Sequence, residues 1–340
     1  MTPVHCRRAS LAIATLLGLG AASAQAATLD EVKKRGELVC GVSQGLAGFS
    51  IEQGGAWLGF DVDFCRALSA AIFADPQKVK FVPLSAGERF EALTSGKIDV
   101  LSRNSTWTLG REAGLGIAFT AVTYYDGQGF LVSRASNVLS ALDMKDVKVC
   151  VQAGTTSEQN AADFLRTNNI AHELVRTQTA AESLAAYSSG RCGVLTSDVS
   201  QLYAERLKLA DAAEHVILPE VISKEPLAPA VREADPEWRL LVQWVHFAML
   251  NAEELGIRTG NVAEAAASKK PDVMRFVGTD GKFGEQLGLA NDWALNIVRL
   301  VGSYGEVYER NLGADSKLGI PRGLNQLWSM GGIQYAPPFR

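Results

Sequence analysis

One stretch of the sequence has the spacing of a catalytic nucleophile. Gly41-Val42-Ser43-Gln44-Gly45 matches G-x-S-x-G, the turn that presents the serine of many hydrolases. That turn requires a strand before it and a helix directly after it. Here the next helical pattern begins only near Phe60, and no histidine stands in a context typical of a triad base. The sequence therefore argues against hydrolysis at Ser43.

The cysteines offer a second kind of chemistry. The chain has five of them: Cys6, Cys40, Cys65, Cys150 and Cys192. No two are close in the sequence, and the histidines after the first few residues are scattered, so the pattern is weak for a metal site. There is neither a G-x-G-x-x-G nor a P-loop, and we expect no metal and no nucleotide cofactor. Disulfides are the remaining use. The four cysteines after Cys6 can form two disulfides in three different pairings.

The first 26 residues are typical of a secretory signal peptide. Arg7 and Arg8 precede an apolar run over residues 11–19 that is too short to span a bilayer, and Ala24-Gln25-Ala26 is an A-x-A cleavage signal. We therefore expect export to the periplasm with cleavage after about Ala26, which also removes Cys6. The later sequence has no apolar run long enough for a membrane anchor.

Length and composition narrow the class of protein further. The chain has 340 residues, of which 47% are hydrophobic and 21% charged, and its net charge is −4. These values indicate a soluble globular protein of two or so domains. A slightly acidic chain has no general attraction for nucleic acid or for anionic membranes, so we expect neither as a partner.

The strands and helices that would position a site form one alternating unit, and this unit occurs twice in the sequence. In the first unit, apolar strands are expected at residues 38–42, 79–84 and 98–101, with helices over 60–72 and 89–94 between them. In the second, strands are expected at 147–151, 173–176 and 192–195, with helices over 157–166 and 180–188. Residues 95–101 align without a gap to residues 189–195. The alternation predicts two similar α/β lobes with parallel sheets.

Four loops follow the strand ends of these two units. They are residues 43–49 and 102–111 in the first unit, and 153–157 and 196–198 in the second. Open parallel sheets bind ligands beyond the carboxyl ends of their strands. Two lobes that face each other would bring the four loops around one cleft.

The strand order of such lobes also limits the disulfides. In a 2-1-3 order, the strands that carry Cys150 and Cys192 are neighbours, so a bridge between them is sterically possible. Cys40 and Cys65 would then join a strand to a helix within the first lobe. We therefore expect the pairs 40–65 and 150–192.

Several segments resemble a known family. They are Arg35-Gly36-Glu37-Leu38, Gly59-Phe60-Asp61-Val62-Asp63, Glu88-Arg89-Phe90-Glu91-Ala92-Leu93, Thr108-Leu109-Gly110-Arg111 and Gly154-Thr155-Thr156-Ser157-Glu158. In order and spacing they resemble the polar amino-acid family of periplasmic solute-binding proteins, which serve ABC importers. The general L-amino-acid-binding branch is similar also in residues 104–108, 124–130 and 331–338.

The resemblance implies a fold and its boundaries. It implies a two-lobed periplasmic-binding-protein fold of type II, α/β in class, whose lobes are joined by two crossing strands and close on the ligand like a hinge. The first lobe would comprise residues 28–127 and 225–281, and the second residues 128–224. Residues 282–340 would form a C-terminal extension packed on the first lobe.

The resemblance also implies the ligand contacts, each with an alternative role. Arg111 would clamp the ligand's α-carboxylate, because a guanidinium fork matches a carboxylate, or else it is a surface residue. Thr155 and Thr156 would present helix-start N–H groups to that carboxylate, or cap the helix. Asp198 would hold the α-ammonium group, or cap the next helix. Asn104 and Thr106 are candidate polar contacts. Phe49 would pack over the ligand, or lie in the core.

Together these features imply a periplasmic protein, a monomer, that captures free L-amino acids and delivers them to an inner-membrane ABC permease. Relatives suggest a broad range, including Glu, Asp, Gln and Asn. The alternative is an amino-acid dehydratase or lyase on the same fold. Such an enzyme needs an acid or base aimed at the substrate side chain, and Asp198 and Glu158 are the obvious acids near the loops.

Overall fold

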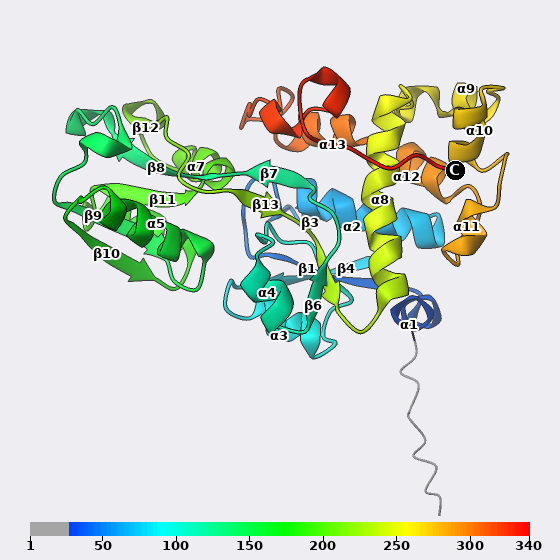
Figure 1. The fold of residues 1–340 in the computed structure, drawn as a ribbon, viewed down its shortest axis with the longest axis horizontal. Helices are drawn as coiled ribbons and strands as arrows, with labels where there is room; N and C mark the ends of the chain where they lie inside the picture. Colours follow the sequence, from blue (N-terminus) through cyan, green and yellow to red (C-terminus); the bar gives the residue numbers. More distant parts are fainter. Residues whose placement is uncertain (1–26) are drawn as a thin grey trace, which may run out of the picture.

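The computed structural model describes residues 27–340, so the expected signal peptide over residues 1–26 lies outside it. Two five-stranded sheets form the cores of two lobes, which lie side by side along the longest axis of the molecule (Figure 1). We call the lobe built on β1 the first lobe and the lobe built on β9 the second lobe. The expected α/β class and two-lobed fold are confirmed.

The sheet of the first lobe has the order β4-β1-β5-β14-β6. β4 and β5 run parallel to β1 on either side of it, and β14 runs antiparallel to β5 and β6. The strands are β1 (Leu38–Ser43), β4 (Val79–Leu84), β5 (Val100–Leu101), β6 (Ile117–Phe119) and β14 (Ala230–Arg232). Its helices are α1 (Thr28–Arg35), α2 (Phe60–Phe73), α3 (Arg89–Thr94), α4 (Leu109–Gly114) and α8 (Pro236–Glu254), and a hairpin of β2 (Ile51–Gln53) and β3 (Ala56–Leu58) precedes α2.

The sheet of the second lobe repeats this plan in the order β10-β9-β11-β8-β12. β10 and β11 are parallel to β9, and β8 is antiparallel to β11 and β12. The strands are β8 (Gln128–Ser133), β9 (Val147–Gln152), β10 (His172–Thr177), β11 (Val194–Asp198) and β12 (His215–Ile217). The helices are α5 (Thr156–Thr167), α6 (Ala180–Ser188) and α7 (Val199–Arg206), with short 3-10 turns at Arg134–Ser136, Ala141–Asp143 and Ala212–Glu214.

Two strands cross between the lobes. β7 (Tyr124–Asp126) and β13 (Glu225–Leu227) pair antiparallel and form a two-stranded ribbon of their own. β7 leads directly into β8 of the second lobe, and β13 leads back to β14 of the first. Because these strands carry the chain between the two sheets, they are the hinge of the molecule.

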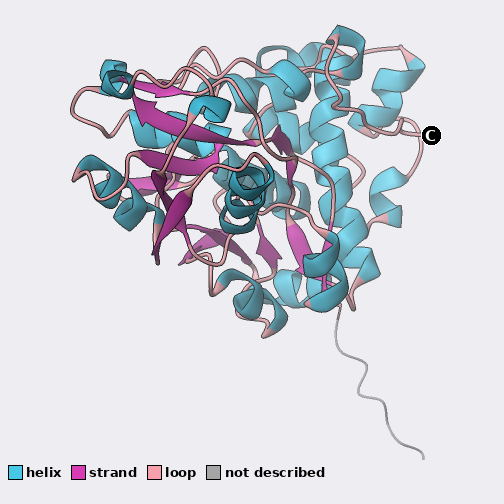
Figure 2. Cartoon of the chain, turned by 60° about the vertical axis from the view of Figure 1, so that its left-hand side comes forward, coloured by secondary structure: helices cyan, strands magenta, loops and turns pink. Residues whose placement is uncertain are grey.

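Residues after α8 form a helical C-terminal part. Its helices are α9 (Val262–Ala266), α10 (Pro271–Val277), α11 (Phe283–Gln286), α12 (Trp293–Leu300) and α13 (Tyr304–Asn311), with 3-10 turns at Thr259–Asn261, η5 (Gly323–Asn325) and Trp328–Met330. α12 and α13 pack on α2 and α8 of the first lobe. In Figure 2 the side of the molecule around the C-terminus is almost entirely helical.

Local sequence explains where α2 begins. Gly59 has φ 132°, and a Cβ atom there would lie 2.1 Å from the backbone oxygen of Phe49. Only glycine fits this close approach, which brings the loop after β1 against the start of the helix. Phe60, Phe64 and Leu68 then repeat every four residues and are buried in the core of the first lobe.

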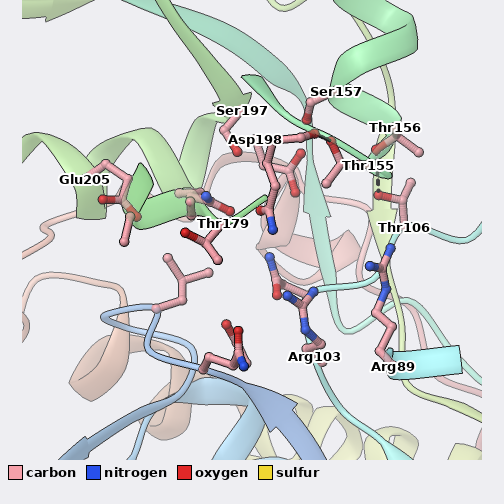
Figure 3. Close-up of a pocket in the computed structure, with 18 of the residues that line it drawn as sticks. Arg89, Arg103, Thr106, Thr155, Thr156, Ser157, Thr179, Ser197, Asp198 and Glu205 are labelled. Carbon is pink, nitrogen blue, oxygen red and sulfur yellow. Dashed lines mark hydrogen bonds between the residues drawn. The ribbon is translucent and has the colours of Figure 1, made fainter. Parts of the chain in front are cut away.

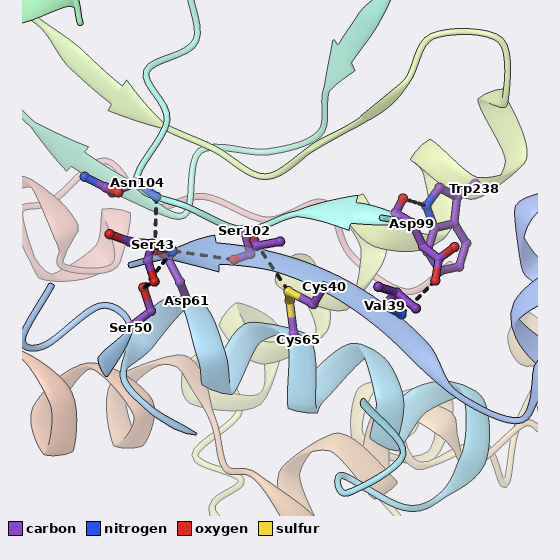
Figure 4. Close-up of a disulfide and its surroundings, with 11 residues drawn as sticks. Val39, Cys40, Ser43, Ser50, Asp61, Cys65, Asp99, Ser102, Asn104 and Trp238 are labelled. Carbon is purple, nitrogen blue, oxygen red and sulfur yellow. Dashed lines mark hydrogen bonds between the residues drawn. A yellow bond between two sulfur atoms is a disulfide. The ribbon is translucent and has the colours of Figure 1, made fainter. Parts of the chain in front are cut away.

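Both expected disulfides are present. Cys40 on β1 is joined to Cys65 on α2, with 6.4 Å between the Cα atoms (Figure 4). Cys150 on β9 is joined to Cys192, two residues before β11, with 5.7 Å between the Cα atoms. The expected 2-1-3 strand order brings Cys150 and Cys192 within reach, and α2, the helix that packs on β1, brings Cys65 to Cys40. Across residues 27–340, no helix is both long and apolar enough to cross a membrane.

Candidate ligand-binding site

A cavity of about 230 Å³ lies between the two lobes, beyond the carboxyl ends of the parallel strands. Its walls come from all four loops expected to face the cleft, and also from the starts of α3, α6 and α7. Cavities for drug-sized ligands usually measure about 300–1,000 Å³, so this one suits a smaller molecule. Figure 3 shows Arg89 and Arg103 reaching in from the first lobe and Asp198, Thr155 and Thr156 facing them from the second.

Arg111 lines this cavity and is held in place on two sides. Its Nη1 atom donates to the backbone oxygen of Thr106 over 2.8 Å, and its guanidinium group lies 5.4 Å from the centre of the Phe90 ring. Burial lowers the pKa of Arg111, while the charges of Glu225 and Asp198 oppose that shift. The result is a partly desolvated, oriented fork of N–H donors, which suits a carboxylate.

The start of α5 faces the same cavity. Thr155 stands at the N-cap position but makes no side-chain capping bond, and its hydroxyl donates to the backbone oxygen of Gln152 over 2.7 Å. The first N–H groups of α5 therefore lack a side-chain cap where Thr155, Thr156 and Ser157 line the cavity. An uncapped start of a twelve-residue helix favours an anion.

Asp198 provides the opposite charge. It ends β11 at the N-cap position of α7, yet its side chain makes no capping hydrogen bond, so the alternative capping role does not apply. The residue is 7% exposed and lines the cavity. Burial raises its pKa, as do the nearby acids Asp126 and Glu225, whereas Arg111 and Arg89 oppose the rise. A cation placed here would relieve the repulsion among these acids.

Asn104 and Thr106 also line the cavity, as expected. Asn104 has φ 25°, and its backbone N–H donates to Asp61 Oδ2 over 2.9 Å (Figure 4). Its side-chain oxygen is buried without a hydrogen-bond partner among residues 27–340. Burial raises the pKa of Asp61 to about 7, although the Asn104 N–H, Arg103 and Ser102 each oppose this.

Phe49 lies elsewhere. It is 1% exposed and packs edge-on against Phe60 and Tyr124, at ring distances of 6.2 and 5.5 Å. The reason is a tight turn: Leu46 and Ser50 exchange backbone hydrogen bonds, so the loop doubles back and sends Phe49 into the core. Leu46 lines the cavity in that loop instead. Phe49 therefore lies in the core, the alternative to packing over the ligand.

Three charged residues of the cavity wall were not singled out from the sequence: Arg89, Arg103 and Glu205. Arg103 donates from Nε to the backbone oxygen of Leu84 over 3.0 Å, and burial lowers its pKa to about 10 although Asp61 opposes this. Arg103 falls inside the loop over residues 102–111 that was expected to face the cleft. A basic residue at that strand end could therefore have been identified from the sequence as a site residue.

Arg89 and Glu205 gave no such signal, because both lie on helices. Arg89 begins α3, where Nη1 donates to the backbone oxygen of Ala86, and its buried Nε atom has no partner in residues 27–340. Glu205 lies on α7, is buried, and forms an ion pair with Lys208. Burial raises the pKa of Glu205, with Lys208 opposing.

The arrangement does not support the chemistry of a hydrolase. Ser43 lines the cavity, but a loop and the β2–β3 hairpin follow it, rather than a helix. The cavity wall contains no histidine, and the three in residues 27–340 bond elsewhere: His172 with Ile170, His215 with Tyr187, and His246 with Gln334. Within the same range, no cluster of His, Cys, Asp or Glu could hold a metal ion.

Glu158, one of the two acids considered for a lyase, turns away from the cavity. Its carboxylate pairs with Arg176 at 2.5 Å and accepts from the backbone N–H of Gly154 at 3.3 Å. It is not part of the cavity wall. Asp198 is therefore the only one of those two acids that a ligand can meet.

Two hinged lobes around a small cavity with opposed charges define a solute-binding protein. The chain matches the bacterial extracellular solute-binding proteins, family 3, over residues 38–257, and it belongs to that family. It is 54% identical, over 96% of this chain and 97% of the relative, to the general L-amino acid-binding periplasmic protein AapJ of Rhizobium johnstonii. It is 47% identical, over 97% of this chain and 98% of the relative, to the glutamate/glutamine/aspartate/asparagine-binding protein BztA of Rhodobacter capsulatus.

A solved structure is similar over nearly the whole length. The ABC transporter periplasmic binding protein from Brucella ovis with glutathione bound is 50% identical, with a TM-score of 0.91 over 93% of this chain and 100% of that one. The similarity to AapJ, BztA and this structure extends past residue 257, so the helical C-terminal part is shared with them.

Proposed function

We propose that this chain is the periplasmic component of an ABC importer, that it binds free L-amino acids between its lobes, and that it delivers them to an inner-membrane permease. The observation that carries the proposal is the pairing of opposite charges across one cavity. Arg111 and the uncapped start of α5 suit an α-carboxylate, and Asp198 suits an α-ammonium group. These two groups are common to all free amino acids.

Closure of the lobes follows from where these residues lie. Arg111 belongs to the first lobe, whereas Asp198 and the start of α5 belong to the second. A ligand held by both would stabilise the closed arrangement over the open one. Movement at β7 and β13 would then open and close the site.

The rest of the cavity supports a preference for side chains with oxygen at the end. Arg89 and Arg103 add two buried cationic groups to the wall, and Thr179 and Gln201 add neutral hydrogen-bonding groups. Such a wall suits the carboxylates of Glu and Asp and the amide oxygens of Gln and Asn. The relatives named for general L-amino acids and for those four support the same range.

Titration calorimetry with each standard L-amino acid tests the proposal. We expect measurable binding of several L-amino acids, strongest for Glu, Asp, Gln and Asn. The matched D-amino acids and the corresponding amines without a carboxylate should bind far more weakly. A protein that binds none of the L-amino acids would contradict the proposal. Recovery of unchanged amino acid after long incubation would separate binding from lyase activity.

Glutathione is a second candidate ligand. The similar Brucella ovis structure contains it, and its γ-glutamyl end has a free α-ammonium and α-carboxylate that the same residues would bind. The rest of the tripeptide would then need room beyond the 230 Å³ cavity, toward the opening between the lobes. Displacement of bound glutamate by glutathione in the same calorimeter would support this candidate, and its failure to compete would remove it.

We also propose that the protein works as a monomer after residues 1–26 are removed. N-terminal sequencing of the exported protein should begin near Ala27. Light scattering should give the mass of one chain, with and without glutamate. A larger mass, or an unprocessed N-terminus, would contradict this part of the proposal.

A further inference from the structure

Glu225 is a buried acid directly behind the wall of the cavity. It stands on the crossing strand β13, opposite Asp126 of β7, and is 1% exposed. It does not line the cavity itself. Its carboxylate nevertheless accepts four hydrogen bonds, two at each oxygen, which is an unusually complete set for one side chain.

The donors come from both lobes. Oε2 receives the hydroxyl of Thr106 at 2.6 Å and the hydroxyl of Thr156 at 3.0 Å. Oε1 receives the side-chain amide of Asn160 at 2.7 Å and the hydroxyl of Ser223 at 2.6 Å. Thr106 belongs to the first lobe, and Thr156 and Asn160 belong to α5 of the second. The hinge acid therefore joins the two lobes at the back of the cavity.

The backbone around Glu225 fixes Thr106 in register with it. Thr106 forms an isolated bridge with Leu227, and the next residue, Trp107, donates its N–H to the oxygen of Pro226 over 2.8 Å. Thr106 also accepts Arg111 Nη1 at its backbone oxygen. Thr106 thus bonds both to Glu225, which lies behind the cavity wall, and to Arg111, which is part of that wall.

These bonds decide how the two threonines can meet a ligand. A hydroxyl group has one proton and two lone pairs. Thr106 and Thr156 both give their proton to Glu225, so toward the cavity, which both line, their oxygens can only accept. The two oxygens lie 3.5 Å apart, with a dashed line between them in Figure 3.

We propose that Glu225 is a positioning residue for ligand specificity: it takes the hydroxyl protons of Thr106 and Thr156 and so makes both oxygens acceptors for the ligand's α-ammonium group. The inference rests on the proposed function, since it concerns how an amino acid is told apart from an acid without the ammonium group. Asp198 supplies the charge for that group, and the threonines supply directed acceptors beside it.

Glu225→Gln reverses the direction of these bonds. In the structure Asn160 donates from its amide nitrogen, and a glutamine that keeps this bond has its oxygen toward Asn160 and Ser223. Its nitrogen then faces Thr106 and Thr156 and donates to them. Both hydroxyls would turn their protons to the cavity, where an ammonium group cannot accept them.

The test compares ligand pairs that differ only at the α position. L-Aspartate is paired with L-malate, and L-alanine with L-lactate, because an α-hydroxyl can either donate or accept. In the unchanged protein the amino acid of each pair should bind more tightly. Glu225→Gln should reduce this preference by about 10- to 100-fold, as expected for lost hydrogen bonds to a charged group.

Asp126→Asn is the matched control. Asp126 lies opposite Glu225 in the ribbon and is partly buried, but it accepts from Ser200 and Gly127 rather than from the threonines. Burial raises its pKa to about 7, so the comparison is made near pH 8, at about one unit above that value, where the group is mostly ionised. Because Asp126 is one of the acids near Asp198, this variant measures the effect of losing a nearby negative charge while both threonines keep their bonds to Glu225. Glu225→Gln should reduce the preference clearly more than Asp126→Asn does, and equal reductions in the two variants would overturn the inference.

Three results would be decisive. If Glu225→Gln leaves the preference unchanged, or weakens both members of a pair equally, the inference is wrong and the proposed function stands. If the unchanged protein binds no amino acid, the proposed function fails as well. If Glu225→Gln does not fold by circular dichroism, Thr156→Val replaces it: it removes one acceptor and should still reduce the preference, and an unchanged preference would overturn the inference.

Discussion

Asn325 and Tyr125 lie 200 residues apart, yet the Asn325 side chain makes both hydrogen bonds that a neighbouring strand would make with Tyr125. Asn325 Oδ1 accepts the Tyr125 N–H at 2.7 Å, and Asn325 Nδ2 donates to the Tyr125 oxygen at 3.0 Å. Tyr125 is the centre of the crossing strand β7, whose other edge pairs with β13. A side-chain amide of the C-terminal part thus completes the hinge ribbon.

Neighbouring contacts extend the same attachment. Gln334 donates to the backbone oxygens of Val122 and Thr123, each at 3.3 Å, and the Tyr304 hydroxyl donates to Thr123 at 2.9 Å. Gln334 and Tyr304 lie beyond position 257, where the match to the family ends. The C-terminal part therefore holds the chain segment that enters the hinge from the first lobe.

Asn325→Ala should destabilise the protein. It leaves the N–H and oxygen of Tyr125 without partners in a partly buried place, and unpaired groups that are fully buried cost about 1–3 kcal/mol each. We expect the free energy of unfolding in urea to fall by about 1–4 kcal/mol, the lower end if water reaches the gap.

Asn291→Ala is the matched control, because it removes the same side chain from the same C-terminal part at a place where, within residues 27–340, that side chain bonds only to Glu285. Its effect should stay within about 0.5 kcal/mol. Equal effects of the two substitutions would show that the bonds to Tyr125 contribute nothing particular.

Arg111→Met and Asp198→Asn should each weaken every amino-acid ligand to a similar degree. Both residues would contact groups shared by all amino acids, and loss of one partner of a buried charge pair costs about 2–5 kcal/mol. This corresponds to about 30-fold to several thousand-fold in affinity. Calorimetry with Glu, Gln and Ala would measure it.

Arg134→Met provides the control for loss of a positive charge, since Arg134 is exposed on the second lobe and only donates to Ala213. Its affinities should match those of the unchanged protein. Should Arg111→Met weaken one amino acid and spare the others, Arg111 would contact a side chain, and its assignment to the α-carboxylate would be incorrect.

The sequence best predicted the helices and strands that a periodic pattern within the segment itself defines. The strand at Val79–Leu84 and the helices at Arg89–Thr94 and Ala180–Ser188 have the expected bounds, because apolar spacing defines the strand and apolar spacing with a following glycine defines the helices. The same patterns predicted the loops at the strand ends, and Arg111 and Asp198 do meet in one cavity. The fourth strand of each sheet, antiparallel β14 and β8, was not predicted, since its partner lies far along the chain.

What sequence reasoning missed depends on three-dimensional packing. Phe49 and Leu46 are both apolar residues of one loop, and only the turn between Leu46 and Ser50 decides which of them faces the cavity. Glu225 has no local motif, and its role depends on threonines more than 60 residues away in the chain. Asn325 likewise meets its partner only in the folded molecule.

The two disulfides should contribute strongly to stability. Their sequence separations are 25 and 42 residues, for which restriction of the unfolded chain gives about 3–4 kcal/mol each. Urea unfolding with and without a thiol reductant should show a lower midpoint for the reduced protein. Peptide mapping without reduction should recover the 40–65 and 150–192 pairs, and free thiols throughout the exported protein would contradict both bridges.

A serine pair at each bridge separates the two contributions. Cys40→Ser with Cys65→Ser removes the link between β1 and α2, and Cys150→Ser with Cys192→Ser removes the link within the second lobe. Because the bridges lie in different lobes, their effects on the free energy of unfolding should add. A combined variant no less stable than either pair alone would contradict that independence.

His246 should make the protein less stable in mild acid. It is buried on α8 between Gln334 and Tyr304, and burial lowers its pKa to about 4 from 6.5, although bonds to Gln334 and to the Val122 backbone oppose this. Between these two pH values the unfolded chain binds a proton that the folded chain does not. Stability therefore falls as the pH drops from 6.5 toward 4, by on the order of 3 kcal/mol from this group.

His246→Gln isolates this effect, because glutamine takes up no proton in this range. The raised pKa values of Asp61 and Asp126 act in the opposite direction, since folded acids that hold their proton gain stability as the pH falls from about 7. Those acids remain in the variant, so the difference between the two proteins reports His246 alone. Urea unfolding at steps from pH 7 to 4 should show the unchanged protein losing its advantage over His246→Gln. A constant difference across that range would mean that burial does not keep His246 neutral. The same change at exposed His172 should have an effect within about 0.5 kcal/mol.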